Sequence, residues 1–456
     1  MNGQNDIQAG VLQRPADDNK EAWIAYWKVQ GQEWRTEPEI DAKRQKELTK
    51  RLAIVPDIKQ GIYPFKNMKL SRADIEWLLA THESGRGPVD WSDESQRERK
   101  GLDVRGADLS QVNLNFLPLT GLRGSLTWNE WLAGTETGEQ RSMAAVHMEK
   151  ASIGNTNLEG ANLYGAQLNE VALYGTNLEG AGLGWADLKG ADLGFAVLEG
   201  ADLRGAALER ALLFNASLKG IDLREANLEG ANLSGASLEG ANLSGAKLEG
   251  TLLMDVVITN SKHIGPQLAD IQWGDTNLAV VDFSQITMLG DEYEALNVIG
   301  QDRVQGVRAY KTATRAYRQL SVVLSNQGLN EDAARFIYRA KRMQRKVFWY
   351  QRKFAQYLGS LFLDLLSGYG YRVGRCFIAY ALVIGVFATI YHLLGTHPAW
   401  NEAVVISMTA FHGRGFFPDQ FHPGDPQALA AAIEAFVGLL IEITLIVTLT
   451  QRLFGK

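Results

Sequence analysis

The chain has 456 residues, of which 46% are hydrophobic and 21% are charged, and it contains 46 Gly and a single Cys. This composition excludes a disordered protein and a small disulfide-stabilised domain, because it supports a large core and one thiol forms no intrachain disulfide. The net charge of −6 hides two opposite segments: residues 146–260 carry 15 acidic and 7 basic side chains, whereas residues 303–375 carry 3 acidic and 15 basic.

Residues 1–100 are expected to form a helical capping segment. No apolar run in this segment is typical of a signal peptide, which favours a cytosolic location. Ser71 followed by Asp74 predicts the start of a short helix. We interpret the tryptophans as a small core that covers the open end of the following domain, with a ligand-binding box as the alternative: Trp23, Trp27, Trp34 and Trp77.

The next segment is a repeat of five residues. Every fifth residue from Leu158 to Leu253 is Leu, usually with Ala two residues before it and often with Gly two residues after it. A period of five matches neither the 3.6 of an α-helix nor the 2 of a strand. The backbone must therefore turn once per unit, with Leu and Ala inside and polar residues outside.

This pattern resembles the pentapeptide-repeat family. The resemblance implies a right-handed quadrilateral β-helix over residues 101–290, with four pentapeptides per coil and an insertion near residues 118–145. It also raises the possibility of a DNA-mimic inhibitor of topoisomerase, which basic residues such as Lys189 and Arg204 disfavour because they interrupt a negative stripe. We expect the rod to bind an unknown cytosolic protein or to take part in gating.

Residues 303–375 predict a basic αα-hairpin. Its second helix mixes Lys and Arg with aromatic residues, a composition also found in nucleic-acid-binding proteins. Because an apolar span follows directly, we favour the surface of an anionic membrane and expect no direct nucleic-acid contact. The residues assigned to the membrane surface are Arg342, Arg345, Lys346, Arg352 and Lys353.

Residues 376–456 contain two apolar spans, 376–395 and 428–450, each long enough to cross a hydrocarbon core of roughly 30 Å. Basic residues before the first span and after the second predict a multi-pass protein of the inner (plasma) membrane with both termini in the cytoplasm. Between the spans, residues 399–412 read as a helix too short to cross a membrane, followed by a Gly-rich turn.

The order span, short helix, Gly-rich segment and span resembles the two-transmembrane pore domain of the potassium-channel family. The resemblance rests on the run from Ser407 to Phe411 and implies a homotetramer. Arg414 and Phe417 stand where the family has Val and Gly, so potassium selectivity does not carry over and a non-selective, anion-preferring or non-conducting pore is expected. The filter-like residues are Thr409, His412, Gly413, Arg414, Gly415, Phe416 and Phe417.

Glu434, Gly438 and Glu442 fall on one stripe of the second span. A carboxylate inside a membrane is costly, so we predict that this stripe faces a water-filled lumen, with pairing to a polar neighbour between subunits as the alternative. No constellation of residues suggests an enzyme, a metal site or a cofactor. The sequence thus predicts a prokaryotic ion-channel-like membrane protein with a cytosolic rod; the alternatives are a membrane-tethered scaffold without conduction and a topoisomerase inhibitor.

Overall fold

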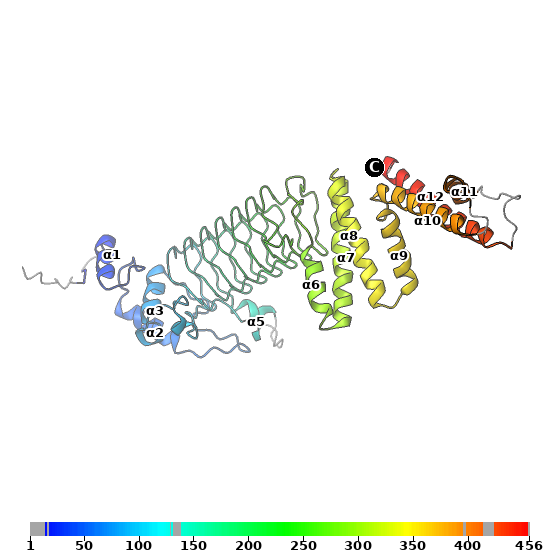
Figure 1. Cartoon of the computed structure of the whole chain (residues 1–456). Coiled ribbons are helices and arrows are strands. Elements are labelled where there is room, and N and C mark those ends of the chain that lie inside the picture. The colour runs from blue at the N-terminus through cyan, green and yellow to red at the C-terminus, as the bar shows by residue number, and fades with distance from the viewer. Residues whose placement is uncertain are drawn as a thin grey trace, which may run out of the picture. The chain divides into compact units, whose positions relative to one another are not determined.

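The computed structural model describes residues 14–15, 18–127, 129–130, 138–394, 398–413 and 424–454. The chain divides into two compact units, Met1–Tyr293 and Glu294–Lys456. The first unit consists of an N-terminal helical segment and a solenoid, and the second consists of helices (Figure 1). The helices of the first unit are α1 (Lys20–Val29), α2 (Ala42–Leu52), α3 (Arg72–Gly85), the short 3₁₀-helix η1 (Glu94–Gln96) and α5 (Gly138–Ser142).

The N-terminal segment is attached to the edge of the solenoid through its backbone and through Arg72. The capping box that the sequence predicts at the start of α3 is confirmed, with Ser71 and Asp74 bonding each other's backbone N–H groups. Directly before it, Leu70 N donates to Asp108 O at 3.0 Å. The guanidinium of Arg72 also donates to the carbonyls of Asn113 and Asn115, which belong to the first coils. This segment therefore satisfies polar groups that the end of a solenoid would otherwise leave unpaired.

Two of the four predicted core tryptophans are buried. Trp23 and Trp27 are 4% and 5% exposed, and their ring centroids lie 5.3 Å apart. Trp27 Nε1 donates to Glu37 O at 2.9 Å. Trp34 and Trp77 are only partly buried.

The solenoid is a four-sided coil. Parallel β-bridges join residues that are 20 positions apart, such as Asn177 with Val197 and Val197 with Ser217, so that four pentapeptides complete one coil. Each side is so short that the pairing consists of isolated bridges rather than long strands. The Leu and Ala of every unit point inward, and Leu198 and Leu218 are 0% exposed. The four pentapeptides per coil expected from the repeat are thereby confirmed.

The corners explain the Gly-rich composition. The last residue of each turn adopts the left-handed conformation, with φ of 66° at Gly200 and 64° at Gly220. This region is free of strain for Gly and costs energy for most other residues. Other corners carry a side chain in the same conformation, among them Trp185 (φ 54°) and Phe195 (φ 57°), whose rings lie on the outside of the coil.

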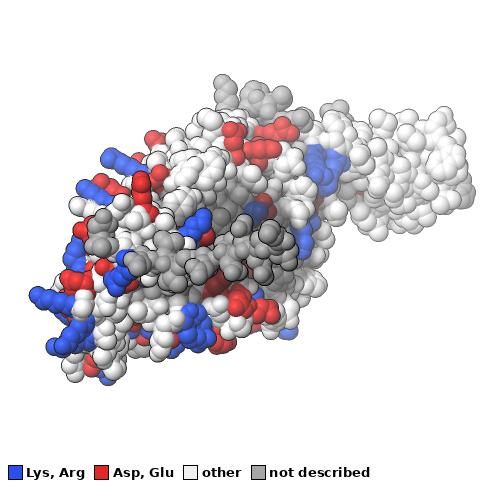
Figure 2. Space-filling view, turned by 90° about the vertical axis from the view of Figure 1, so that its left-hand side faces the viewer, with Lys and Arg blue, Asp and Glu red and all other residues white. Residues whose placement is uncertain are grey.

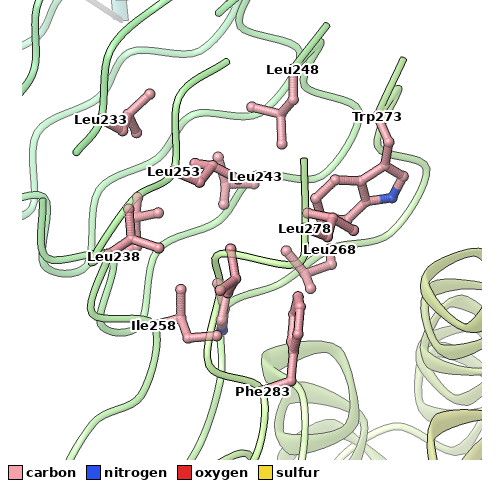
Figure 3. A pocket seen from close by; sticks show the side chains of 13 residues that line it. Leu233, Leu238, Leu243, Leu248, Leu253, Ile258, Leu268, Trp273, Leu278 and Phe283 are labelled. Atoms are coloured by element: carbon pink, nitrogen blue, oxygen red, sulfur yellow. The ribbon is translucent and has the colours of Figure 1, made fainter. Parts of the chain in front are cut away.

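The coil spacing changes at both ends of the solenoid. Asp108 pairs with His147 across 39 residues, so the chain between residues 127 and 143 is inserted into a coil without breaking the stack. At the other end Asn242 pairs with Gln267, 25 residues away. The longer coil leaves an apolar cavity of about 30 Å³ in the interior, where the side chains of Leu243, Leu268 and Phe283 point toward a common space (Figure 3).

The second unit begins within α6 (Gly290–Ile299) and continues through six further helices. The predicted hairpin forms as α7 (Arg303–Asn326) and α8 (Asn330–Tyr350), whose facing aromatic rings stack, as Tyr317 does on Phe336. The helix after this hairpin was not predicted from the sequence. The six helices are α7 (Arg303–Asn326), α8 (Asn330–Tyr350), α9 (Phe354–Ser367), α10 (Val373–Leu393), α11 (Trp400–Phe411) and α12 (Pro426–Phe454).

Two of these helices are long and apolar enough to cross a membrane. They are α10 and residues Pro426–Thr450 of α12, with mean hydropathy of 2.0 and 2.2. Only 17% and 22% of their most apolar windows are buried, whereas a core helix of a soluble protein is mostly buried. Figure 2 shows, at its right, a projecting part of the surface that is nearly free of charged atoms.

Candidate functional site

The three C-terminal helices hold a short helix between two long ones. α11 has 12 residues and, at 1.5 Å per residue, a length of roughly 18 Å, which is too short for a hydrocarbon core of roughly 30 Å. Its buried face, which includes Ala403, Ile406 and Ala410, packs on Ala388 and Tyr391 of α10. The short helix predicted between the spans thus lies against both of them.

A buried carboxylate connects all three helices. Glu434 of α12 is 0% exposed. Its Oε2 accepts a hydrogen bond of 2.8 Å from Tyr391 Oη of α10, and its Oε1 accepts one of 2.5 Å from Ser407 Oγ of α11. A carboxylate without such partners is very costly to bury. Two donors from separate helices therefore make the position of α11 depend on Glu434.

Gly438 lies one helical turn beyond Glu434, where the backbone of α12 closely approaches the end of α11. A Cβ on Gly438 would lie 2.1 Å from the carbonyl oxygen of Phe411. Phe411 in turn packs its ring on Tyr380 of α10, with 4.7 Å between the centroids. Glycine is therefore required here because the backbone at the end of α11 occupies the space of a side chain.

The third residue of the predicted stripe meets the end of α11. Glu442 Oε1 lies 3.5 Å from His412 Nε2, a contact that becomes an ion pair when the imidazole is protonated. His412 Nδ1 lies 2.7 Å from Met408 O, which places a proton on Nδ1. Glu434 and Gly438 both face α11 of the same chain, whereas the side chain of Glu442 is 38% exposed. The lumen-facing stripe stays a prediction.

The filter-like segment is described only in its first part. Thr409 donates its hydroxyl to Val405 O at 2.9 Å, within its own helix. Gly413 ends α11 in the left-handed conformation, with φ of 68°. The remaining filter-like residues lie outside the described part of the chain: Arg414, Gly415, Phe416 and Phe417.

The basic residues assigned to the membrane surface divide into two groups. Arg342, Arg352 and Lys353 are exposed. Arg345 instead forms an ion pair with Asp364 of α9, with Nη1 2.6 Å from Oδ2, and Lys346 Nζ lies 5.1 Å from the centre of the Tyr310 ring. Arg345 is thus engaged within the protein. The sequence did not indicate this ion pair, since the carboxylate comes from α9, a helix that was not predicted.

Asp364 is a site residue that the sequence analysis missed. Burial alone would raise the pKa of its carboxyl, but hydrogen bonds from Tyr338 and Arg345, together with the charge of Arg345, hold the pKa below its ordinary value. The signal in the sequence was its isolation, since Asp364 is the single charged residue of the apolar α9. An acidic residue in such a segment indicates a cationic partner nearby.

The surface of the rod carries paired charges. Arg204 contacts both Asp202 and Asp222, and Lys189 lies 3.6 Å from Glu209 in the next coil. Figure 2, which faces the N-terminal end of the first unit, likewise shows blue and red atoms intermixed. These pairs interrupt the acidic columns that a DNA mimic would need.

One corner of the rod exposes aromatic rings. Tyr174, Phe195 and Phe214 come from three successive coils, and their ring centroids lie 5.4 to 6.4 Å apart. Tyr174 and Phe195 are 43% and 48% exposed. We call these three residues the aromatic patch; exposed rings of this kind are more typical of a contact surface than of a solvated corner.

Comparison with known proteins identifies the repeat. A family model described as pentapeptide repeats (8 copies) matches residues 142–180, 181–220 and 216–255. No curated protein matches the chain.

Solved structures of pentapeptide-repeat and related proteins align with part of the chain. QnrB1, a plasmid-mediated fluoroquinolone resistance protein, is 20% identical, with 42% of this chain and 81% of that chain covered and a TM-score of 0.22. HetL from Nostoc sp. strain PCC 7120, a pentapeptide-repeat protein involved in the regulation of heterocyst differentiation, is 23% identical, with coverages of 37% and 90% and a TM-score of 0.12. The pentapeptide-repeat protein alr5209 from Nostoc Pcc 7120 is 32% identical, with coverages of 23% and 84% and a TM-score of 0.15. The family match and the 20-residue coil together show that residues 142–255 are a pentapeptide-repeat region, in a chain that also has two helices fit to cross a membrane.

Proposed function

We propose that the C-terminal unit spans a membrane through α10 and α12, assembles with copies of itself as a homotetramer, and forms an ion-conducting pore. Both termini lie in the cytoplasm, and the pentapeptide-repeat rod binds a cytosolic partner or takes part in gating. The single observation that carries this proposal is α11, a helix too short to span, which Glu434 holds between two membrane-length helices.

The chemistry at the end of α11 supports a water-filled space. The helix ends at His412 and Gly413, which are exposed, and Glu442 lies beside them. Inside a bilayer, the free carbonyls at a helix end and a carboxylate are tolerated only where they are buried in protein or line a cavity. Copies of the chain around a common axis would provide such a cavity.

The sequence of the turn after α11 argues against potassium selectivity. Arg414 adds a cation, and Phe417 occupies a position where carbonyl coordination requires Gly. The pore we propose is therefore non-selective or prefers anions.

Ion flux through proteoliposomes tests the proposal. Full-length protein should conduct K⁺, Na⁺ or Cl⁻, and Glu442→Gln should change the conductance or its rectification, because it removes a charge beside the proposed pore. The matched control is Glu331→Gln, an acidic residue in the first turn of α8 outside the membrane helices, which should leave the currents unchanged. Absence of flux for all three ions at any voltage and pH would reject the pore.

A second candidate, a membrane-tethered scaffold without conduction, is favoured by the aromatic patch on the rod. A photo-reactive amino acid at Phe195 should then form a crosslink to one cytosolic protein in cells. The same group at Glu179, on another corner of the rod, is the control. Equal crosslinking from both positions would show that the patch is not a specific contact surface.

A further inference from the structure

The helix α9 exposes its apolar side and buries its polar side. Four of its large apolar residues recur at spacings of four, four and three, which place them on one stripe; Leu363, which is 43% exposed, lies outside it. The four residues are Phe354, Leu358, Phe362 and Leu365, with exposed fractions of 53%, 61%, 42% and 67%. In contrast, Asp364 and Ser367 are 8% and 1% exposed. This arrangement is the reverse of a surface helix in a soluble protein.

Hydrogen bonds fix the rotation of α9 about its axis. Asp364 accepts from Tyr338 Oη at 2.7 Å and from Arg345 Nη1 at 2.6 Å, which attaches the polar side to α8. Ser360 Oγ lies 2.6 Å from Tyr369 Oη, on the turn after the helix. With the polar side held in this way, the apolar stripe has to face outward.

The position of α9 in the chain identifies what lies against the stripe. The helix ends at Ser367 and the membrane-length α10 begins at Val373. The two helices are in direct contact, since Cys376 Sγ donates to Leu366 O at 3.3 Å and Arg375 donates to Asp364 O at 2.8 Å (Figure 1). The start of α10 therefore places α9 beside the membrane surface.

The N-terminal end of α9 has the composition of a membrane interface. Trp349 and Tyr357 pack on each other with 5.1 Å between their ring centroids, and Phe354 joins them. Arg352 and Lys353, directly before the helix, are exposed. Aromatic rings concentrate at the level of lipid headgroups, and cations near the surface attract anionic lipids. At 14 residues, or roughly 21 Å, α9 is too short to cross the bilayer.

We propose that α9 is an interfacial helix: it lies along the bilayer surface with its apolar stripe in the acyl-chain boundary, while α8 holds its polar side on the aqueous side. This proposal rests on the membrane location of the proposed function, but it does not require conduction.

Site-directed spin labelling of the full-length protein tests it in vesicles of phosphatidylcholine and phosphatidylglycerol. The background is Cys376→Ser, which removes the single native thiol. A nitroxide at Leu358→Cys should lie about 5 to 10 Å below the phosphates, more accessible to oxygen than to a water-soluble nickel complex. Gln356→Cys is the matched control, because this exposed position is turned by roughly 160° from Leu358 and should report the aqueous phase.

Two results would overturn the proposal. Equal nickel accessibility at the two positions would place the stripe in water. Protection of the label at position 358 from both reagents, with broadening from a second label, would show that another copy of the chain covers the stripe. Loss of ion flux would change neither readout, so failure of the pore and failure of the interfacial helix are distinguishable.

Discussion

Tyr391 of α10 donates a hydrogen bond of 2.8 Å to the carboxylate of Glu434 of α12, although 43 residues separate the two. Ser407 supplies the second donor, and its hydroxyl also lies 3.1 Å from Ile384 O. Among the described residues, Tyr391 and Ser407 are the two donors to this carboxylate, whereas Ser407 has a second acceptor. We therefore expect removal of the carboxylate to destabilise the three helices more than removal of one donor.

Glu434→Ala should destabilise the three-helix arrangement more than Tyr391→Phe. The Tyr391→Phe variant loses one hydrogen bond to a charged group, at a cost of about 1.5 to 3 kcal/mol, and keeps the bond from Ser407. Glu434→Ala loses both bonds and leaves a cavity between the three helices, so its cost is larger. The measurement is the thermal unfolding midpoint of the full-length protein in detergent. The control is Thr444→Val, because the Thr444 hydroxyl bonds only within its own helix, to Leu440 O. Equal midpoints for Glu434→Ala and Thr444→Val would contradict the role of the carboxylate.

Gly438→Ala should displace the end of α11. The added Cβ would lie 2.1 Å from Phe411 O, a backbone atom that moves only with the helix. Overpacking of this kind costs about 1 to 3 kcal/mol. Gly385→Ala in α10 is the matched control, because a Cβ there meets nothing within 4 Å and removal of a helical Gly is favourable. A lower unfolding midpoint for Gly438→Ala, with an equal or higher one for Gly385→Ala, is the expected result; the reverse order would show that α11 does not approach α12 so closely.

The parts of the structure that could be predicted are those determined by neighbours in the sequence. Leu at every fifth position specifies a turn in each unit independently, so the coil follows from local pattern. The partners of Glu434 come instead from two other helices, and no spacing within α12 indicates them. The helix α9 was missed for a related reason: its Leu and Phe residues are typical of a buried stripe, and only the contacts of Asp364 show that the opposite side is the one held by the protein.

Asp364→Asn should weaken the attachment of α9 to α8. It should also make the stability of this attachment less dependent on pH in the acid range. Because the folded protein holds the pKa of Asp364 below its unfolded value of 3.8, the ion pair contributes its full stability above that pH and loses it as the pH falls through the lower, folded pKa. Replacement of the carboxylate removes a charged hydrogen bond to Arg345, at a cost of about 1 to 3 kcal/mol. Hydrogen exchange of the α9 amides, measured between neutral and acid pH, should rise in the variant at neutral pH and change less on acidification. Equal exchange rates in the variant and in the unchanged protein at neutral pH would show that Asp364 does not attach α9 to α8.

The interior of the rod offers a test of packing at its C-terminal end. Val256 is among the residues that line the cavity of about 30 Å³. The rings of Trp273 and Phe283 lie beside the same space (Figure 3). It is large enough for one additional methylene group, whose burial contributes about 0.8 kcal/mol. Val256→Ile should therefore raise the urea midpoint of the full-length protein, followed by the circular dichroism of the β-helix.

The matched control adds volume where the coil is already filled. Ala206 is 0% exposed in the middle of the rod. Ala206→Val should therefore lower the free energy of unfolding by about 1 to 3 kcal/mol, and with it the urea midpoint. Opposite signs for the two variants would show that the 25-residue coil, and not the regular 20-residue coil, leaves the interior incompletely packed. A decrease for both would mean that Trp273 and Phe283 already close the space, in which case the end of the rod is as tightly packed as its middle.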